Sequence, residues 1–579
     1  MHRFLFLALL LVAAATGCGE SAPTFVEPPV LTADEEGELR LTLTPKYSTI
    51  ALNDDADDDV RARVYMDSFA PATLQVSPGD TFRITLTNEL RDEPTNLHFD
   101  GMNVSPLDSA EGAGDDVFLS VEPQETQEYE VPIPSWHPAG IFSWRAAPAG
   151  YTAGQVGNGM AGAVLVTGIL DSFPQISGIQ QRLFLLKDVQ FAGDGSLLTP
   201  PDTMRETTLT VNGLEKPVLK AQPGEVQLWN IANASADLYY RLALANHTLY
   251  ELARDGNLHT RLLLRDTILL PPSARVSVLV SAGEEDEYAL SAQPLGNQPP
   301  GFEEFFPDGT DPVYSAGACG SAMLDNTAGC ENSAAARCMG PQGPCLVGGT
   351  LATLRVKGDR VVSPQLPSED QFPEVADLRD SRRCRRRVVN FQEGPAGRAF
   401  YINDKPFSPD RTDFQVRLDA GEECVEEWQI NNCTGENHVF HIGQVDFQVI
   451  EAEGTPVPFT GYQDTVNVPF RDCDRFEGLD PECKVQEIDG EVWPIYGCPS
   501  GDDPTGRIVI RLPFATAALG RFTFQCAEAG HSDNGMMGTI EVCDDIFIPC
   551  TPEPTPAPSP TPTPTPNDGR EPVTPGRPS

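Results

Sequence analysis

Long apolar runs are missing from this 579-residue chain once its first residues are passed. The run from Phe4 to Ala15 is apolar, but it is too short to span a bilayer as a mature helix. No other stretch approaches the length of a membrane span. The sequence therefore predicts no membrane-spanning helix in the mature protein.

Positive charge is also scarce. Lys and Arg together number 40 against 84 Asp and Glu, which gives a net charge of −44. A chain of this charge is repelled by polyanions, so nucleic acid is excluded as an expected partner, as is adhesion to anionic lipid surfaces. Two interpretations of the acidic exterior stay open: it keeps the protein soluble, or it steers a basic redox partner.

The first 18 residues are typical of an export signal. They begin with His2 and Arg3, continue with the apolar run, and end Ala-Thr-Gly-Cys at residues 15–18. Small residues directly before a cysteine resemble a bacterial lipobox, in which the cysteine takes a lipid and becomes the new N-terminus. The alternative is a plain secretory signal cut nearby, which leaves Cys18 an ordinary thiol. We expect an exported lipoprotein of the bacterial cell envelope, on the periplasmic side or the cell surface, held to the membrane only through Cys18.

Glycine and proline are abundant, at 50 and 53 residues, without a collagen-like period. This composition indicates many turns and short strands rather than long helices. Short runs rich in Val, Ile, Phe and Thr recur between Gly, Pro, Asn and Asp, which predicts antiparallel sandwiches or barrels. The predicted strands include residues 81–87, 224–231, 276–280, 424–430 and 507–512.

The strand pattern divides the chain into three stretches of similar size, which is within the three or four domains that its length allows. A similar three-residue motif occurs at residues 78–80, 223–225 and 420–422, directly before or at the start of one predicted strand in each stretch. Each of these strands is followed or ended by an asparagine, Asn88, Asn230 or Asn431. This indicates an internal repeat at domain scale. The predicted limits are 1–18 for the signal peptide, 25–168, 169–362 and 380–547 for the domains, and 551–579 for a disordered Thr/Pro-rich tail.

An insertion at residues 312–348 stands out within the second stretch. It holds Cys319, Cys330, Cys338 and Cys345 among small residues, and we interpret it as a loop closed by two disulfides. Its spacing fits no tight zinc pattern. The chain has 14 cysteines, so an odd number remains once Cys18 is set aside as the lipid site. One cysteine should therefore do something other than pair within the chain.

The third stretch offers a chemical role for that cysteine. His531 lies five residues after Cys526 and Met536 ten residues after it, and His438 lies well upstream. This is the loop spacing of a blue-copper site. A thiolate and two imidazoles make a trigonal plane that suits both oxidation states of copper, and a weak axial thioether leaves little to rearrange during electron transfer. The alternative is a disulfide at Cys526 beside two ordinary polar histidines.

Four segments together resemble the multicopper oxidase family, in its bacterial laccase-like form. They are residues 95–101, 137–147, 438–443, and Gln525-Cys526-Ala527 with its downstream His531 and Met536. The resemblance extends from about Ala70 to Val542. It implies an all-β fold of three consecutive cupredoxin-like Greek-key β-sandwich or barrel domains, with copper as the cofactor.

The departures from the family decide what chemistry the resemblance can imply. The family uses ten histidine ligands, two at the type 1 copper and eight at a trinuclear cluster that reduces dioxygen, whereas this chain has eight histidines in all. Only His98 and His441 stand at cluster positions, both those of type 2 ligands. The type 3 positions hold Asp100, Arg145, Ala147, Gly443, Gln525 and Ala527. Asp100 can pair with Arg145 and fill the vacated space.

Three interpretations of His98 and His441 stay open. They are hydrogen-bonded remnants in a domain interface, or they hold one metal ion with Asp100 and water, or they belong to a working oxidase. Two imidazoles and a carboxylate can bind a metal, but Arg145 nearby opposes a cation. His137, His247 and His259 match no ligand position and are expected on the surface or in loops.

The sequence thus predicts a copper-binding envelope lipoprotein with one type 1 copper and no trinuclear cluster. We expect a monomer that transfers single electrons and meets a redox protein partner of the cell envelope near His531. One alternative is a multicopper-oxidase-type oxidoreductase that acts on phenols or metal ions and uses a non-standard acceptor site. The other is a non-redox binding or structural scaffold.

Overall fold

The structure is a computed structural model, and it describes most of the chain. The described residues are 22–51, 59–191, 197–198, 207–293, 302, 304–306, 348–394, 399–418, 423–434, 436–469, 484–488, 491–495, 506–544 and 546–550. The predicted signal peptide with Cys18, nearly all of the insertion at 312–348 and the tail at 551–579 lie outside these residues. The predictions for those segments therefore stay predictions.

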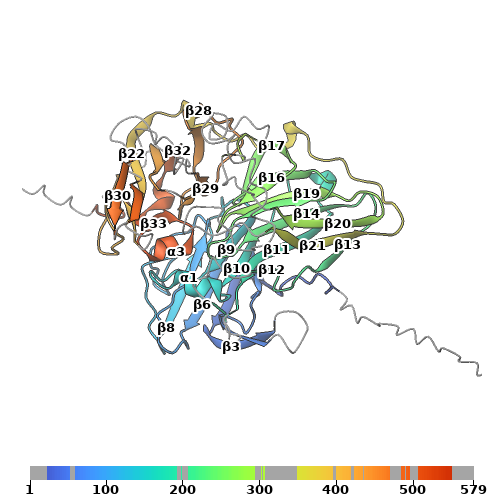
Figure 1. Cartoon of the computed structure of the whole chain (residues 1–579), viewed down its shortest axis with the longest axis horizontal. Coiled ribbons are helices and arrows are strands. Elements are labelled where there is room, and N and C mark those ends of the chain that lie inside the picture. Colours follow the sequence, from blue (N-terminus) through green and yellow to red (C-terminus); the bar gives the residue numbers. More distant parts are fainter. Residues whose placement is uncertain are drawn as a thin grey trace, which may run out of the picture.

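The described chain is almost entirely β-structure, which confirms the predicted all-β fold of three cupredoxin-type domains. Three β-units follow one another in the sequence, and Figure 1 shows them as a blue, a green and an orange group that meet in the middle of the molecule. Each unit contains two main sheets that face one another across a hydrophobic core. No described helix is long and apolar enough to cross a membrane.

The first unit has a five-stranded sheet in the order β1-β5-β10-β9-β7, a three-stranded sheet β2-β6-β8 and a hairpin β3-β4. Its core contains Trp144 and a stacked pair of rings, Phe82 and Phe99. The strands are β1 (Val30–Thr32), β2 (Glu38–Leu43), β3 (Lys46–Ala51), β4 (Asp59–Val64), β5 (Thr73–Val76), β6 (Thr81–Thr87), β7 (His98–Asp100), β8 (Thr126–Pro132), β9 (Gly140–Arg145) and β10 (Ala161–Val166).

The second unit has a six-stranded sheet, β12-β11-β14-β19-β16-β17, and a five-stranded sheet, β13-β21-β20-β15-β18. Its core contains Trp229. The strands are β11 (Gln180–Val189), β12 (Thr208–Val211), β13 (Val218–Ala221), β14 (Val226–Asn233), β15 (Tyr240–Leu244), β16 (Leu249–Arg254), β17 (Asn257–Arg265), β18 (Ile268–Leu270), β19 (Arg275–Ser281), β20 (Asp286–Ala292) and β21 (Gly349–Val356).

The third unit repeats this plan with the sheets β23-β22-β25-β32-β27-β28 and β24-β34-β33-β26-β29, and adds a hairpin β30-β31. Its core contains Trp428. The strands are β22 (Arg383–Glu393), β23 (Phe400–Ile402), β24 (Phe414–Arg417), β25 (Cys424–Asn432), β26 (His438–Ile442), β27 (Gln448–Ala452), β28 (Thr455–Pro456), β29 (Thr465–Val468), β30 (Lys484–Ile488), β31 (Glu491–Ile495), β32 (Gly506–Phe514), β33 (Gly520–Cys526) and β34 (Met537–Cys543).

The five predicted strands are all present, as β6, β14, β19, β25 and β32. In β6 buried and partly exposed residues alternate strictly, whereas every residue of β14 is buried. The sheets are mostly antiparallel, as predicted, but each unit also contains parallel pairs that the sequence analysis did not specify. The parallel pairs are β1–β5, β5–β10 and β2–β6 in the first unit, β11–β14 and β13–β21 in the second, and β22–β25 and β24–β34 in the third. Alternation of side chains marks a strand and its buried face but carries no information on the direction of its neighbour.

The internal repeat is confirmed, but at different asparagines in two of the units. Asn88, Asn233 and Asn432 each follow or end the strand that the repeated phrase opens, and each donates two side-chain hydrogen bonds to backbone carbonyls. The prediction named Asn230 and Asn431 instead. It did not allow for the growing length of the strand, which has seven residues in β6, eight in β14 and nine in β25.

Two short α-helices lie where the first and third units meet. Helix α1 (Thr152–Gly157) and helix α3 (Ala529–Asp533) are neighbours in Figure 1 and contact one another. The Asp533 carboxylate accepts hydrogen bonds from the backbone N–H groups of Gly150, Thr152 and Ala153, at 2.8–3.2 Å. A side chain of the third unit therefore caps a helix of the first. Short 3₁₀-helices complete the fold at Pro174–Ile176, Glu369–Gln371, Leu378–Asp380 and Thr516–Ala518.

Candidate metal centres

The four predicted type 1 copper ligands come from neighbouring elements of the third unit. His438 begins β26 and Cys526 ends β33, and the two strands pair with Phe440 opposite Cys526. His531 lies in α3, and Met536 directly precedes β34. Two backbone hydrogen bonds close the loop, from the Cys526 N–H to the Met536 carbonyl and from the Met536 N–H to the His531 carbonyl.

The structure brings the three strong donors together. The Cys526 sulfur lies 3.7 Å from Nδ1 of His438 and 3.6 Å from Nδ1 of His531, and the two Nδ1 atoms are 3.1 Å apart. Three donors at these separations can all contact one ion placed between them, and a thiolate with two imidazoles is the set that blue copper uses. The side chain of Met536 is fully buried. The donor set therefore fits copper.

Burial favours the uncharged form of all three donors. It lowers the pKa of His438, together with the neighbouring His531, and it lowers the pKa of His531 to about 3. Burial and the nearby Glu528 raise the pKa of the Cys526 thiol. Both imidazoles are thus neutral and present lone pairs, and the thiol gives up its proton when a metal binds.

Further groups of this centre escaped the sequence analysis. Glu528 lies 3.6 Å from Nδ1 of His531 and accepts a hydrogen bond from the Tyr239 hydroxyl, and Glu436 lies 3.4 Å from Nε2 of His531. Val439 donates its backbone N–H to the Cys526 sulfur at 3.4 Å. Glu528 is only two residues from Cys526 and could have been noticed, but the sequence carries no sign that Tyr239 of the second unit reaches this centre.

His531 is the side of the centre that reaches solvent. Its side chain is 12% exposed, whereas His438 and Cys526 are fully buried. The ring of Phe400 packs over His531 with the ring centres 4.4 Å apart, and Phe391 packs against His438. The expectation that His531 is the surface-facing histidine agrees with this geometry.

The remnants of the cluster positions form a second group at the junction of the units. His98 of β7 lies opposite Arg145 of β9 in the strand register, and His441 of β26 lies opposite Gln525 of β33. Arg145 donates from Nε to Asp100 at 2.6 Å, which confirms the expected pair. Burial alone would raise the pKa of Asp100, but Arg145, with His98 and His441, lowers it to about 2.

Both surviving histidines are held through their Nδ1 atoms. Nδ1 of His98 lies 3.0 Å from Asp115. Burial alone would lower the pKa of His98, but this carboxylate, with Asp100, raises it. Nδ1 of His441 lies 3.1 Å from the backbone carbonyl of Asp464 and must donate to it, because a carbonyl only accepts. A neutral His441 therefore carries a lone pair on Nε2. Asp115 and Asp464 carry no short-range sequence signal that links them to these histidines.

The Nε2 atoms of His98 and His441 and the Oδ1 atom of Asp100 face one another. Oδ1 of Asp100 lies 3.4 Å from Nε2 of His98 and 3.8 Å from Nε2 of His441. Neither Oδ1 of Asp100 nor Nε2 of His441 has a hydrogen-bond partner among the described residues, and both atoms are closed to solvent. Two buried acceptors this close need a positive species between them, which is a proton on one imidazole or a metal ion.

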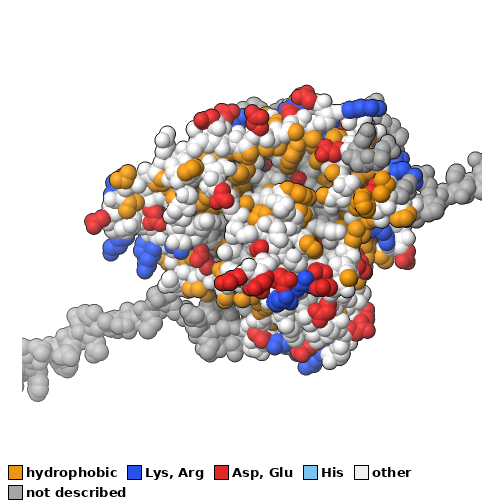
Figure 2. Space-filling model, turned by 180° about the vertical axis from the view of Figure 1, so that it is seen from behind, with side chains coloured by type: hydrophobic (Ala, Val, Ile, Leu, Met, Phe, Trp, Pro, Cys, Tyr) orange, Lys and Arg blue, Asp and Glu red, His pale blue; other side chains and the backbone are white. Residues whose placement is uncertain are grey.

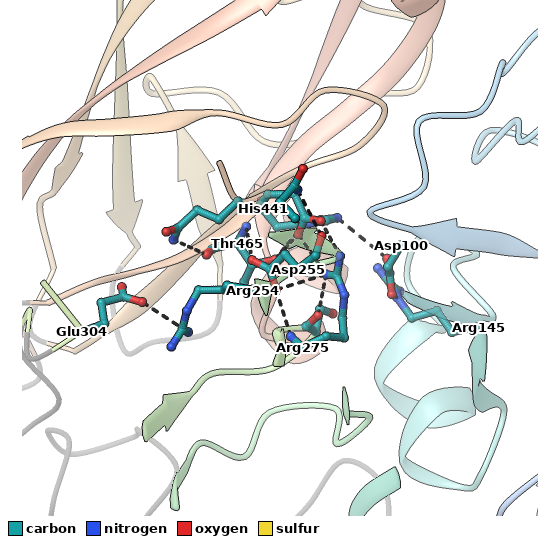
Figure 3. A network of polar contacts seen from close by, with 12 residues as sticks. Asp100, Arg145, Arg254, Asp255, Arg275, Glu304, His441 and Thr465 are labelled. Carbon is teal, nitrogen blue, oxygen red and sulfur yellow. Dashed lines mark hydrogen bonds and ion pairs between the residues drawn. The ribbon is translucent and has the colours of Figure 1, made fainter. Parts of the chain in front are cut away.

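Ion pairs connect this group to the second unit, as Figure 3 shows. Arg275 forms a two-pronged pair with Asp464 and also lies 3.6 Å from Asp255, with all three side chains essentially inaccessible. Asp255 accepts the backbone N–H of Thr465 at 3.2 Å. Residues from all three units thus share one buried polar network.

On the side of Asp100 and Ala527, the space at the former cluster positions is small and poor in donors. A cavity of about 10 Å³ lies beside Asp100, Arg145 and Ala527, which is room for roughly one water molecule. A Cβ atom at Gly443 would meet no atom closer than 3.9 Å, so that position supplies neither a ligand nor a filler. In the described chain this junction offers one carboxylate and two imidazoles to a metal.

The remaining histidines correct one expectation. His247 lies in a loop and is partly exposed, as expected. His137 lies in a loop but is buried, and burial lowers its pKa to about 4. His259 is buried in β17 with Nε2 3.2 Å from Glu251. Both are structural side chains, and His259 also contacts the third unit, with Nδ1 3.1 Å from the Thr460 carbonyl. A sequence search for ligand positions does not detect such roles.

The cysteine pairing agrees with the odd number of cysteines that remain once Cys18 is set aside. Disulfides join Cys384 to Cys424 and Cys543 to Cys550, and Cys526 is the free cysteine among the described residues. The alternative of a disulfide at Cys526 is therefore wrong.

Comparison with known proteins gives a consistent result. Three family models, each described as multicopper oxidase, match residues 48–169, 187–304 and 379–473. A multicopper oxidase of Staphylococcus aureus is 21% identical over 482 residues, which is 81% of each chain, and a laccase of Bacillus stratosphericus is 22% identical over 406 residues, 66% of this chain and 68% of its own. Among solved structures, a metallo-oxidase from Campylobacter jejuni has a TM-score of 0.66 at 19% identity, covering 90% of this chain and 96% of its own.

Proposed function

Because the chain belongs to the multicopper oxidase family, we propose that it holds one type 1 copper and transfers single electrons as a redox protein of the cell envelope. The proposed ligands are His438, Cys526, His531 and the axial Met536. The observation that carries the proposal is a contrast. Three donors meet at the first centre with separations of 3.1–3.7 Å, whereas the cluster positions hold Asp100 paired to Arg145.

The chain's own residues prepare the first centre for electron transfer. Bound copper supplies a one-electron couple, and a thiolate with two imidazoles changes little between its two states. The backbone N–H of Val439 stabilises negative charge on the sulfur, and the packed rings of Phe391 and Phe400 hold the two imidazoles in place. A rigid, largely dry donor set of this kind favours rapid one-electron exchange.

The path that the family uses from this centre to a cluster is interrupted. The residues on either side of Cys526 are Gln525 and Ala527, neither of which has an imidazole. Gln525 lies opposite His441 in the strand register, so the position nearest the surviving histidine lacks the bridging ring. Electrons would therefore leave through the partly exposed His531, where we place the docking of a redox protein partner.

The proposed setting is the bacterial cell envelope, with the monomeric protein tethered by a lipid on Cys18. A tether would keep the copper centre close to membrane-bound redox proteins. Figure 2 shows one face of the molecule, on which red acidic side chains gather especially over the lower part. An acidic exterior of this kind would suit a basic partner.

Copper content and visible absorption test the proposal. The purified chain should bind one copper and show the strong visible band of a copper–thiolate bond. Cys526→Ser should lose the band, and His247→Gln, which changes a histidine outside both centres, should keep it. Four coppers per chain would refute the proposal. A colourless protein without copper would favour the scaffold alternative instead.

A second candidate function rests on the orphaned acceptors at Asp100 and His441. Here His98, His441 and Asp100 would hold one metal ion that serves as a non-standard acceptor, and the protein would oxidise phenols or metal ions. The Nδ1 atoms of the two histidines, which would point away from the metal, are already held by Asp115 and Asp464. Metal-bound histidines commonly have such hydrogen-bond partners on the other ring nitrogen. The Arg145 guanidinium, which is hydrogen-bonded to the Asp100 carboxylate, opposes the binding of a metal cation there.

Metal counting and oxygen uptake separate the two candidates. A second metal ion that His441→Gln removes while the visible band persists, together with steady oxygen consumption on a phenol, would establish the oxidase. One copper and no steady turnover would leave the electron carrier as the function.

A further inference from the structure

A cavity of about 200 Å³ opens between the first and third units, beside the former cluster positions. Its floor includes His98, Arg145 and Gln525, and its walls include Phe118, Leu119 and Phe407. Two positions that hold imidazoles in the family resemblance, Ala147 and Gln525 here, line the cavity. An engineered cavity of about 150 Å³ holds a benzene molecule, so this one is large enough for a small ring with a polar substituent.

The lining of the cavity lacks the negative charge that dominates the rest of the molecule. The chain has 84 acidic residues, yet none of the residues that line this cavity is Asp or Glu. Arg145 lines it, and Arg521 lies just outside the wall, stacked on Phe118 and bonded to the carbonyl of Pro409. An anion entering here would meet no carboxylate in the lining and would lie beside the Arg145 guanidinium, which is paired with Asp100.

Two largely buried polar side chains in the lining have hydrogen-bond donors without a partner in the described chain. Gln525 is only 7% exposed, and its amide has no hydrogen-bond partner among the described residues. Arg145 is 6% exposed and donates from Nε to Asp100 and from Nη1 to the carbonyl of Ala146, but Nη2 has no partner in the described chain. Both side chains line the cavity, so these donors are available to an acceptor on a ligand.

We propose that this cavity binds a small monocarboxylate with a compact apolar body, such as an aromatic acid. The carboxylate would accept from Nη2 of Arg145 and from the amide of Gln525, and the body would pack against Phe118, Leu119 and Phe407. The ligand would touch both the first and the third unit. This site is independent of the type 1 copper and does not rest on the proposed electron transfer.

Benzoate is the probe that tests the site, in calorimetric titrations of the copper-loaded full chain. It should bind with one-to-one stoichiometry and a Kd on the order of 1 mM or tighter. Benzyl alcohol keeps the ring without the charge, and acetate keeps the charge without the ring. Both should bind about tenfold more weakly or worse, since each loses one half of the contacts. The copper–thiolate band should not change on binding.

Two variants locate the binding. Gln525→Leu keeps the size of the side chain and removes its donor, and it should weaken benzoate about tenfold. Ala147→Phe should fill the cavity and abolish binding. Gln127→Leu, at a partly exposed position on β8 outside the cavity lining, is the matched control and should leave the affinity unchanged. No saturable binding to the wild-type chain, or equal affinity in all three variants, would overturn the proposal.

Hydrogen exchange on the wild-type chain tests the same site without any substitution, in case a variant does not fold. Benzoate should slow exchange of the backbone amides at 117–120 and 147–149, which lie at the cavity wall. Unchanged exchange in both segments at saturating benzoate would overturn the proposal.

Discussion

The Asp100–Arg145 pair shows how two charges can occupy a space from which metal ligands are missing. Both side chains are nearly inaccessible, with 1% and 8% of their side-chain surface exposed. Removing one partner of such a pair leaves an uncompensated buried charge, which typically costs about 3–5 kcal/mol. We expect Asp100→Ala to lower the free energy of unfolding by about this amount, as measured by denaturant titration of the metal-free chain.

The matched control is an exposed pair. Glu287 pairs with Arg355 at 2.7 Å, but the two side chains are 57% and 44% exposed. Glu287→Ala should cost less than about 1 kcal/mol because solvent screens the interaction. The double variant Asp100→Leu/Arg145→Met removes both charges and should recover most of the lost stability. Equal costs for the buried and the exposed pair would contradict this account.

The Asp100 carboxylate also makes stability depend on pH, and its pKa gives the sign of that dependence. The folded-state pKa of Asp100 is about 2, below the ordinary value of 3.8. Its contribution is fully present above pH 4 and is lost as the pH falls toward 2, because the unfolded chain then binds the proton first. The stability difference between the wild type and Asp100→Asn should shrink by about 2 kcal/mol across this window. A difference that stays constant from pH 4 to pH 2 would show that the ion pair is not responsible.

At the scale of elements, α3 carries His531 and is attached to the first unit through one carboxylate. Asp533 accepts three backbone N–H groups at the start of α1, of which Thr152 is buried. Asp533→Ala leaves these donors unpaired and should lower the stability by about 1–3 kcal/mol. It should also speed the loss of copper, measured as decay of the visible band in the presence of a chelator.

Asp34→Ala is the comparison for this prediction. Asp34 likewise accepts two backbone N–H groups, from Glu36 and Glu38, but it is exposed and distant from α3. Its replacement should have a smaller effect on stability and none on copper release. Copper release that is as slow in Asp533→Ala as in Asp34→Ala would mean that α3 is held by other contacts.

The elements also show what the sequence could and could not predict. Cys526, His531 and Met536 lie within one loop, so their spacing alone indicated a common site, and their geometry follows from a single strand–helix–strand passage. Asp115 and Asp464 were not predictable, because they reach His98 and His441 through tertiary contacts rather than through a local motif. Asn233 was missed since a turn phrase fixes where a strand begins but not how many residues it contains.

At the scale of the whole molecule, acidic groups trapped between the units make stability depend on pH. Asp446 of the third unit receives a hydrogen bond from Asn103 of the first at 2.9 Å, and its Oδ1 atom is closed to solvent without a partner among the described residues. Burial, together with Asp464, raises its pKa to about 7, although Asn103, Asn257 and Arg275 act in the opposite direction. The junction is therefore most stable when this carboxyl carries a proton.

Asp446→Asn should reveal this effect as a flatter pH profile. A pKa that is higher in the folded than in the unfolded chain gives a contribution that is complete below about pH 4 and is lost as the pH rises through 7. The wild type should therefore lose stability relative to Asp446→Asn between pH 4 and pH 8, by about 1–3 kcal/mol since the side chain is only partly covered. Thermal unfolding at a series of pH values measures it, with Asp286→Asn as an exposed control that should track the wild type. If Asp446→Asn tracks the wild type as well, the charge at this junction is compensated and the pH dependence arises elsewhere.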